Sequence, residues 1–137
     1  MKDSELVEKA KKARLRAYAP YSKFKVGAAL LTKKGKVYTG VNIENATFGL
    51  TVCAERVAIL KAVTNGEKNF VKIAVVVDKD EPVTPCGACC QVLSEFCSDL
   101  KIVCANLKGK TKRYNLRELL PEAFEKFNKG LSMDVAD

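Results

Sequence analysis

Apolar residues recur along this chain with the spacing of a helix in some stretches and of a strand in others. At the N-terminus, apolar residues recur at the spacing of a helix, namely Leu6, Ala10, Ala13 and Ala17. We expect this first helix to begin with Ser4 as its cap and to end before Pro20. Residues 26–32 are apolar at nearly every position and precede the polar turn 33–36, so residues 37–43 are expected to return as a partner strand. The chain therefore opens with a helix and a β-hairpin.

The remaining pattern continues the alternation of helices and strands. The expected elements are a loop over 44–49, a helix capped by Thr51 and ended by 65–66, a buried strand over 71–78, a helix over 86–96, strands over 102–106 and 112–114, and a helix over 116–127 with Pro121 inside it. The order αββαβαββα predicts an α/β protein, folded as a three-layer α/β/α sandwich. Neither a repeat nor a linker interrupts this order, so we expect residues 1–137 to form a single domain.

Composition and charge narrow the class of protein. Of the 137 residues, 47% are hydrophobic, which is typical of a globular chain. No apolar run approaches the roughly 20 residues of a membrane span, and the N-terminus lacks the apolar stretch of a signal peptide. We therefore expect a cytoplasmic protein with no membrane partner.

The formal net charge of +8 raises nucleic acid as a possible partner. The basic residues are spread along the sequence, however, and no aromatic residues alternate with them as stacking platforms. This distribution favours a solvated surface. The expectation is that the protein has no nucleic-acid partner.

Six cysteines in a chain of this size indicate either disulfides or a metal site, and the absence of a secretory signal favours metal. Cys97 and Cys104 lie among apolar neighbours, as buried core thiols do. The others include the pattern C-x-E, formed by Cys53 and Glu55, and the pattern P-C-x-x-C, which starts at Pro85 and supplies Cys86 and Cys89. Together they give the three-cysteine form of the signature of zinc nucleobase deaminases.

Three thiolates suit a catalytic zinc ion, because tetrahedral coordination leaves a fourth position for water. Cys53 and Glu55 fall in the first turn of one predicted helix, while Cys86 and Cys89 fall at the start of the next. The positive end of a helix dipole stabilises thiolates there. Three thiolates on Zn²⁺ sum to a net charge of −1, so we expect Arg56 to donate to the ligand sulfurs and withdraw part of that charge.

Two other interpretations of the cysteines remain open. Cys90 could serve as a fourth ligand and close the site into a structural zinc module. Consecutive helical residues point about 100° apart, which argues against Cys90 sharing a face with Cys86 and Cys89. A thioredoxin-like C-x-x-C is disfavoured, because Pro85 and the third thiol at Cys53 are superfluous to redox exchange.

Four motifs in order carry a family resemblance. They are Ala19-Pro20-Tyr21-Ser22-Lys23-Phe24-Lys25-Val26-Gly27-Ala28-Ala29-Leu30, Asn42-Ile43-Glu44-Asn45-Ala46, Cys53-Ala54-Glu55-Arg56 and Pro85-Cys86-Gly87-Ala88-Cys89. They resemble the small, homotetrameric, zinc-dependent cytidine deaminases, and the likeness runs from about Ala10 to Phe124. The resemblance implies a mixed five-stranded sheet between layers of helices.

The resemblance implies hydrolytic deamination of cytidine and deoxycytidine, with release of ammonia, in pyrimidine salvage. One zinc per chain on Cys53, Cys86 and Cys89 would activate a water to add at C4 of the base, and Glu55 would shuttle the protons. Asn42 and Glu44 are two residues apart at a strand end, so they project to one face, where they could hold ribose hydroxyls. The sequence alone is equally consistent with ordinary turn residues at these two positions. The substrate-binding positions implied are Phe24, Asn42, Glu44, the backbone of Ala54, and Phe124, the last in a neighbouring subunit of a homotetramer with shared active sites.

The chain departs from the family pattern at two positions. Cys90 stands where the family usually has Arg, and Phe48 stands where it usually has Tyr. The alternative function is a deaminase of the same fold that acts on another nucleoside-like substrate, such as a nucleoside antibiotic or an RNA base. Against an RNA base stand the scattered charge and the absence of His, since polynucleotide editors typically follow the H-x-E form.

Overall fold

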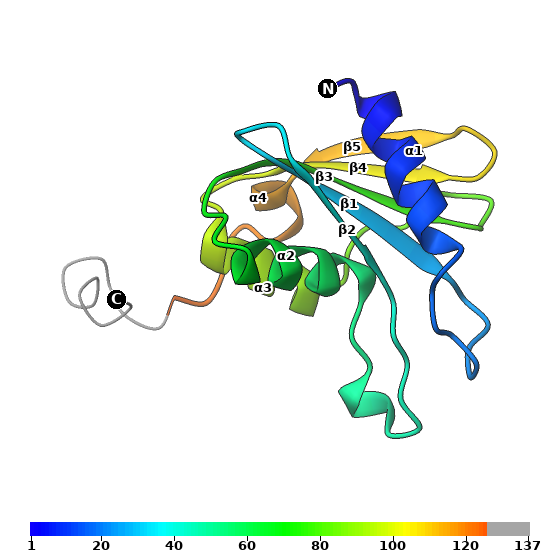
Figure 1. Cartoon of the computed structure of the whole chain (residues 1–137). Coiled ribbons are helices and arrows are strands. Elements are labelled where there is room, and N and C mark those ends of the chain that lie inside the picture. Colours follow the sequence, from blue (N-terminus) through cyan, green and yellow to red (C-terminus); the bar gives the residue numbers. More distant parts are fainter. Residues whose placement is uncertain (126–137) are drawn as a thin grey trace.

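A computed structural model describes residues 1–125 and contains one mixed sheet of five strands (Figure 1). The strands are β1 (Val26–Thr32), β2 (Val37–Val41), β3 (Phe70–Val77), β4 (Lys101–Asn106) and β5 (Thr111–Asn115), in the spatial order β2-β1-β3-β4-β5. Only β3 and β4 run parallel, and the other neighbours are antiparallel. The predicted mixed five-stranded sheet is confirmed.

Helices cover both faces of this sheet and give the three layers that the sequence predicts. The helix α1 (Asp3–Arg14) lies on one face, and α2 (Ala54–Thr64) and α3 (Gly87–Phe96) lie on the other (Figure 1). A short α4 (Leu116–Leu119) joins the second group through buried Leu116. Among residues 1–125, no helix combines the length and apolar character that crossing a membrane requires.

Strand β1 shows how one run of apolar residues serves both layers. Successive side chains of a strand point to opposite faces of the sheet. Accordingly, Ala28 and Leu30 pack in the core beneath α2 and α3, whereas Ala29 and Leu31 pack beneath α1. Every one of these side chains is buried, which explains why the run lacks polar alternation.

Two glycines allow helices to lie directly against the sheet. A Cβ atom on Gly27 of β1 would come within 2.1 Å of the carbonyl oxygen of Ala10 in α1. On the opposite face, a Cβ on Gly40 of β2 would come within 2.3 Å of the carbonyl oxygen of Ala54, the first residue of α2. Backbone contact at Gly40 therefore fixes the start of α2.

The first helix differs at both ends from the sequence prediction. It is capped by Lys2 rather than Ser4, with the backbone N–H of Lys2 donating to the Glu5 carboxylate over 2.9 Å. It ends at Arg14 rather than continuing to Ala17. The chain becomes extended there because Tyr18 exchanges backbone hydrogen bonds with Asn42 and Glu44.

Two later helices are also shorter than predicted. The cap of α2 is Cys53 rather than Thr51, whose hydroxyl instead accepts the backbone N–H of Asn45. The last helix, predicted over 116–127, stops at Leu119. Leu120 is extended (φ −142°, ψ 81°) because it precedes Pro121, and the residue before a proline is driven from helical geometry. The final two residues of that prediction lie outside the described part of the chain.

Candidate functional site

The beginnings of α2 and α3 bring three cysteine sulfurs together. Cys53 is the N-cap of α2, Cys86 is the N-cap of α3, and Cys89 lies in the first turn of α3. Their Sγ atoms all lie within 4.8 Å of one another, and those of Cys86 and Cys89 are 3.6 Å apart. The predicted convergence of two helix starts is confirmed.

This cluster fits a zinc ion. With Zn–S bonds of about 2.3 Å, tetrahedral geometry places ligand sulfurs about 3.8 Å apart, close to the spacing observed here. Cys89 is buried, Cys53 is half-buried and Cys86 is exposed, so the cluster is accessible from the side of Cys86. Three protein ligands with an accessible side correspond to a zinc site that keeps one position for water or substrate.

Hydrogen bonding distributes negative charge unevenly over the three sulfurs. Hydrogen bonds from the Cys89 thiol and from the Arg56 guanidinium lower the pKa of Cys53 to about 5. The hydrogen bond that the Cys89 thiol donates to Cys53, together with burial, raises the pKa of Cys89. Cys53 therefore ionises more readily than Cys89, as expected at the N-terminus of a helix beside an arginine.

Arg56 lies where the sequence analysis expects it, beside a ligand sulfur. Its Nη2 donates to Cys53 Sγ over 3.5 Å and to the backbone carbonyl of Thr51 over 3.2 Å. The Nε atom is buried and has no hydrogen-bond partner among residues 1–125. Its contacts with Cys53, followed by those with Cys89, raise the pKa of Arg56, so its positive charge stays fixed at the cluster.

Glu55 is a buried carboxyl group next to the cluster, with 5% of its surface exposed. Burial raises its pKa to about 7, and the negative charge of Cys53 adds to the effect. A carboxyl group with a pKa near neutrality can both accept and return a proton at physiological pH. This property suits the proton-carrying role that the sequence analysis assigns to it.

Asn42 and Glu44 both anchor the loop that joins α1 to β1. The Asn42 side chain accepts the N–H of Val26 over 2.8 Å and donates to the carbonyl of Phe24 over 2.7 Å. Glu44 accepts the backbone N–H groups of Tyr21 and Ser22 as well as the Ser22 hydroxyl. The hydroxyl, followed by the two amides, lowers the pKa of Glu44. Sequence reasoning missed this anchoring, since the partners lie about 20 residues away.

The remaining predicted substrate positions differ in their environment. Phe24 is half-buried, and Lys79 Nζ lies 5.1 Å from the centre of its ring, a contact that sequence reasoning missed. Ala54 is fully buried at the start of α2. Phe124 is 74% exposed, and its backbone forms two 2.9 Å hydrogen bonds with the Gln91 side chain of α3.

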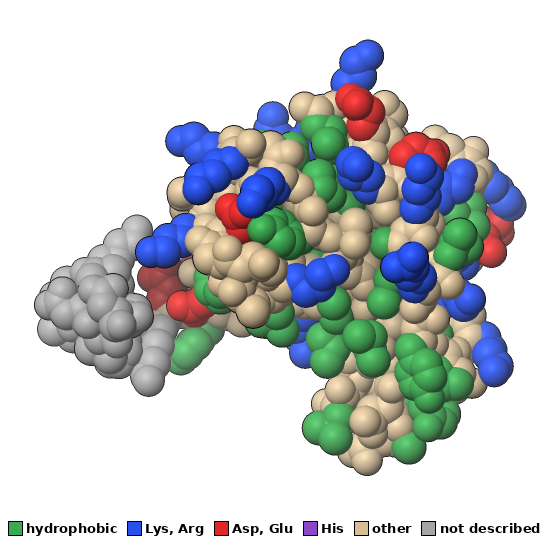
Figure 2. Space-filling view, in the orientation of Figure 1, with side chains coloured by type: hydrophobic (Ala, Val, Ile, Leu, Met, Phe, Trp, Pro, Cys, Tyr) green, Lys and Arg blue, Asp and Glu red, His purple; other side chains and the backbone are tan. Residues whose placement is uncertain are grey.

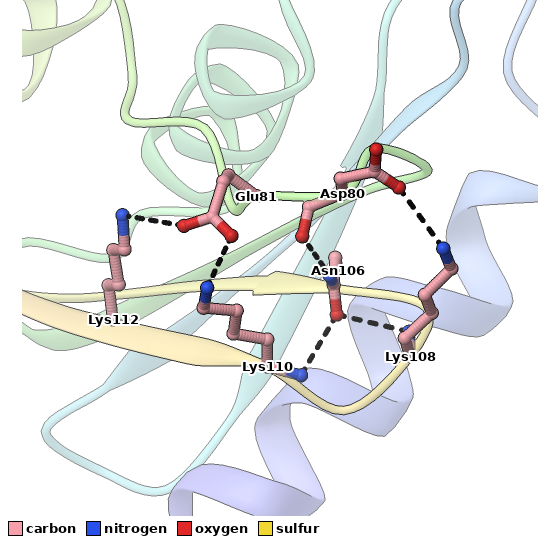
Figure 3. A network of polar contacts seen from close by, with 6 residues as sticks. All are labelled: Asp80, Glu81, Asn106, Lys108, Lys110 and Lys112. Atoms are coloured by element: carbon pink, nitrogen blue, oxygen red, sulfur yellow. Dashed lines mark hydrogen bonds and ion pairs between the residues drawn. The ribbon is translucent and has the colours of Figure 1, made fainter.

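A polar network holds the segment that leads into Cys86 (Figure 3). The buried Asn106 side chain donates to the Asp80 carbonyl over 2.9 Å and accepts the N–H groups of Lys108 and Lys110. The Glu81 carboxylate forms ion pairs with Lys110 and Lys112. The loop after β3 is thereby tied to the β4–β5 turn. Asn106 was also missed by sequence reasoning, because an Asn that ends an apolar strand carries no further signal.

Cys90 is separate from the three-sulfur cluster. It is buried in the core with Cys97 and Cys104, as predicted for the latter two. Its Sγ lies 3.7 Å from the carbonyl oxygen of Pro85. Among the described residues, the group of metal-binding side chains comprises Cys53, Cys86 and Cys89 without it. The geometry therefore supports the open site over the closed four-cysteine one.

Comparison with known proteins identifies the family. Residues 1–106 match the family model described as "Cytidine and deoxycytidylate deaminase zinc-binding region". This chain belongs to that family. The match includes all three sulfur ligands and Glu55, so the cluster at the starts of α2 and α3 is the zinc-binding region of a cytidine and deoxycytidylate deaminase family member.

Individual members of the family share most of the chain. A curated cytidine deaminase from Halalkalibacterium halodurans is 53% identical over 120 residues, which cover 87% of this chain and 91% of that protein. The crystal structure of cytidine deaminase from Burkholderia pseudomallei has a TM-score of 0.88 and 48% identity, covering 90% of this chain and all of that one. A blasticidin-S deaminase from Bacillus cereus is 38% identical over 127 residues, which cover 87% of this chain and 89% of that protein.

Proposed function

We propose that this protein is a hydrolase that deaminates cytidine and deoxycytidine to the corresponding uridines and releases ammonia. The observation that carries the proposal is the three-sulfur cluster with a buried carboxyl group beside it, within a family that deaminates cytosine nucleosides and nucleotides. The whole chain would act as one catalytic domain, since the zinc ligands and the substrate positions are drawn from residues 24 to 124.

Cys53, Cys86 and Cys89 would hold one zinc ion per chain. When bound, zinc supplies a polarised water whose oxygen can add to C4 of the base. Glu55 would take one proton of that water and transfer it to ring N3. It would then take the second proton from the hydroxyl now on C4 and deliver it to the amino group as the C4–N bond breaks, so that water and cytidine give uridine and ammonia. Arg56 holds Cys53 in place and offsets the charge of the thiolates.

The substrate would bind between the anchored loop and α2. Phe24 offers a ring for the base, the start of α2 at Ala54 offers backbone groups for a base edge, and Asn42 and Glu44 face the ribose. Because both oxygens of Glu44 and both polar atoms of Asn42 already bond to the loop, ribose hydroxyls would join existing hydrogen bonds. The nucleoside pocket is thus preorganised before substrate arrives.

We also propose that the protein assembles into a homotetramer with shared active sites. Large apolar side chains are exposed on the loop between β2 and α2 and on α2 itself, where Figure 2 shows hydrophobic groups gathered on a protruding part. The exposed fractions reach 70% at Phe48, 65% at Leu50 and 49% at Leu60. Exposed apolar groups of this size mark interaction surfaces. Phe124, which is also exposed, would then close a neighbour's pocket.

The deaminase proposal is tested by measuring zinc content and ammonia release on the same sample, for the wild type beside Glu55→Gln. The expected result is one zinc per chain in both proteins and a turnover about a thousandfold slower in the variant, since proton transfer contributes on that scale. Zinc without turnover of cytidine, deoxycytidine or blasticidin S in the wild type would instead identify a structural zinc module.

Assembly is tested by light scattering of the wild type and of Leu50→Asp. Removal of an apolar contact in an oligomer interface should reduce the particle mass and the activity together. A matched substitution in the sheet, Val71→Asp, alters a solvent-exposed residue of β3 and should leave the mass unchanged. A wild type that is already monomeric at working concentration would contradict the shared-site proposal.

A second substrate class is favoured by one observation. The relative that is 38% identical over 127 residues is a blasticidin-S deaminase. The family resemblance implies a Tyr at the position of Phe48, in the loop that would reach a neighbour in the proposed tetramer. If the protein acts on such an antibiotic, its kcat/KM for blasticidin S exceeds that for cytidine. The Phe48→Tyr variant should then shift this ratio towards cytidine.

A further inference from the structure

A groove of about 430 Å³ runs along the outer edge of β2, between α1 and α2. Strand β2 is the terminal strand of the sheet, so α1 covers one of its faces and α2 covers the other. The polar residues that line the groove come from these elements and the turn after α1: Lys9 and Lys12 from α1, Arg16 from the turn that follows it, Thr39 from β2, and Lys61 from α2.

The charged groups that line this groove are all positive. Lys9 and Lys12 share one side of α1, since they are three residues apart, and Arg16 lies in the turn directly after that helix. No carboxylate lines the groove, and none of these residues or Lys61 takes part in an ion pair among residues 1–125. Figure 2, which views the molecule from this side, shows more Lys and Arg than Asp and Glu over α1 and the adjoining sheet edge. Four unpaired cations around one hollow attract an anion.

The backbone of β2 adds hydrogen-bond donors to the same groove. Asn42 N–H bonds to the Val26 carbonyl and Thr32 N–H bonds to the Lys36 carbonyl, so the alternate residues of the hairpin point their backbone groups at β1. In an antiparallel pair, the residues between them direct both N–H and C=O outwards. Thr39 is one of these, and its outward carbonyl accepts Lys61 Nζ over 2.6 Å.

The bond from Lys61 to the Thr39 carbonyl distinguishes between two kinds of occupant. An extended peptide that added a sixth strand would need both the N–H and the C=O of Thr39, and that carbonyl is already bonded to Lys61. Phosphate oxygens only accept hydrogen bonds, so the remaining ammonium, guanidinium, hydroxyl and N–H donors suit them. We propose that this groove is a binding site for an oligophosphate, either the phosphate chain of a nucleotide or a free inorganic polyphosphate.

The site is distinct from the zinc cluster but touches the same helix. Lys61 and Val57 of α2 line the groove, while Cys53 and Glu55 lie at the start of that helix. Gly40 of β2 rests against the backbone of Ala54 and Ala58 between them. An oligophosphate that bridges Lys12 of α1, or Arg16 just after that helix, to Lys61 therefore ties together the elements that support the active site.

The test is a calorimetric titration of the zinc-loaded, full-length protein with inorganic tripolyphosphate at physiological ionic strength. The groove variant is Lys12→Gln with Arg16→Gln, and the matched control is Lys11→Gln with Lys34→Gln, which removes the same charge outside the groove. We expect one site per chain and a Kd raised about tenfold or more in the groove variant, since hydrogen bonds to charged groups are on that scale. The control should change the Kd by less than about twofold. Zinc content measured after each titration confirms that the probe leaves the metal in place.

Several outcomes overturn the proposal. Equal weakening in both variants would show that only overall charge matters, and no binding at about 1 mM would leave the groove without an oligophosphate ligand. An acidic peptide that binds more tightly than tripolyphosphate would favour strand addition instead. A parallel titration with ATP, which carries the same number of phosphates on a nucleoside, identifies the source. If ATP binds more tightly than tripolyphosphate, the groove is assigned to nucleotides, and if the two bind equally, it is assigned to free oligophosphate. In either case the groove variant should bind the ligand more weakly than the wild type.

Discussion

Arg56 Nη2 donates to the sulfur of Cys53 across 3.5 Å while also holding the Thr51 carbonyl at 3.2 Å. The guanidinium thus links a zinc ligand to the backbone two residues before it. A planar group with several fixed donors can make both contacts at once, which a lysine ammonium on a flexible chain cannot reproduce. Arg56 therefore acts on both the position and the charge of Cys53, beside the hydrogen bond from Cys89.

We therefore predict that Arg56→Gln weakens zinc binding. Losing a partner that orients a metal ligand typically costs tenfold to a hundredfold in metal affinity or activity, so a loss of about that size is expected. Competition with a chromogenic chelator measures the affinity. Arg117→Gln removes an exposed guanidinium that bonds to the Ser98 carbonyl far from the cluster and serves as the control. Unchanged affinity in Arg56→Gln would exclude the proposed role.

Gly40→Ala should damage both stability and turnover. Its Cβ would lie 2.3 Å from the Ala54 carbonyl oxygen and 2.6 Å from the Ala58 nitrogen, so α2 must move away from β2. Overpacking of this kind costs about 1–3 kcal/mol, and the shift displaces Cys53 and Glu55 with the helix. Denaturant unfolding and ammonia release measure the two effects. Gly49→Ala, which meets open space, should unfold like the wild type.

The acid limb of stability should depend on Asp3. Hydrogen bonds from Lys72 and Arg113 lower the pKa of this carboxyl group below its ordinary value of 3.8. A lowered pKa means that the stabilisation is present above about pH 4 and is lost as the pH falls through the pKa of the folded state.

Asp3→Asn is accordingly expected to lower the free energy of unfolding by about 1 kcal/mol at pH 7, or Tm by about 4 °C. The difference from the wild type should shrink at pH 3, and thermal unfolding at both pH values measures it. Asp80→Asn alters a carboxylate that is 92% exposed and should have little effect at either pH. A difference independent of pH would show that Asp3 acts by packing alone.

Asn106→Ala should destabilise the loop before Cys86. The change leaves the N–H groups of Lys108 and Lys110 without their acceptor, at a cost of about 1–3 kcal/mol. Asn106→Asp keeps an acceptor for both and loses only the donation to Asp80, so it should lie between the wild type and Asn106→Ala. Urea unfolding and zinc affinity measured on the two variants would separate these contributions, and equal stability of all three proteins would contradict the role of the network.

Sequence alone predicted the elements of this fold and the three cysteines that cluster at the helix starts, because both depend on local patterns. The alternation of apolar residues determines which face of β1 is buried, and the two cysteine motifs coincide with helix starts. The ends of the elements were less predictable, since they depend on hydrogen bonds to residues distant in sequence. Tyr18 lies outside the first helix because its backbone bonds to that of Asn42, and α2 is capped by Cys53 rather than Thr51.

Contacts between distant segments were the part that sequence could not supply. Lys9, Lys12, Arg16 and Lys61 look scattered along the chain, yet the docking of α1 and α2 on either face of β2 gathers them around one groove. The same holds for Lys79 beside Phe24 and for Glu44 beside Ser22. Such groupings depend on how elements pack, which no local spacing encodes.

The origin of the three sulfurs also has a consequence for the unfolded chain. Cys86 follows Cys53 by 33 positions, and α2 and β3 lie between them. An ion held by both thiolates acts as a cross-link, which restricts the entropy of that segment when the protein unfolds. By analogy with a disulfide of this loop length, the restriction is equivalent to about 4 kcal/mol. The metal that takes part in the reaction would therefore also stabilise the middle of the chain against unfolding. Its removal by a chelator would destabilise α2 and β3 together.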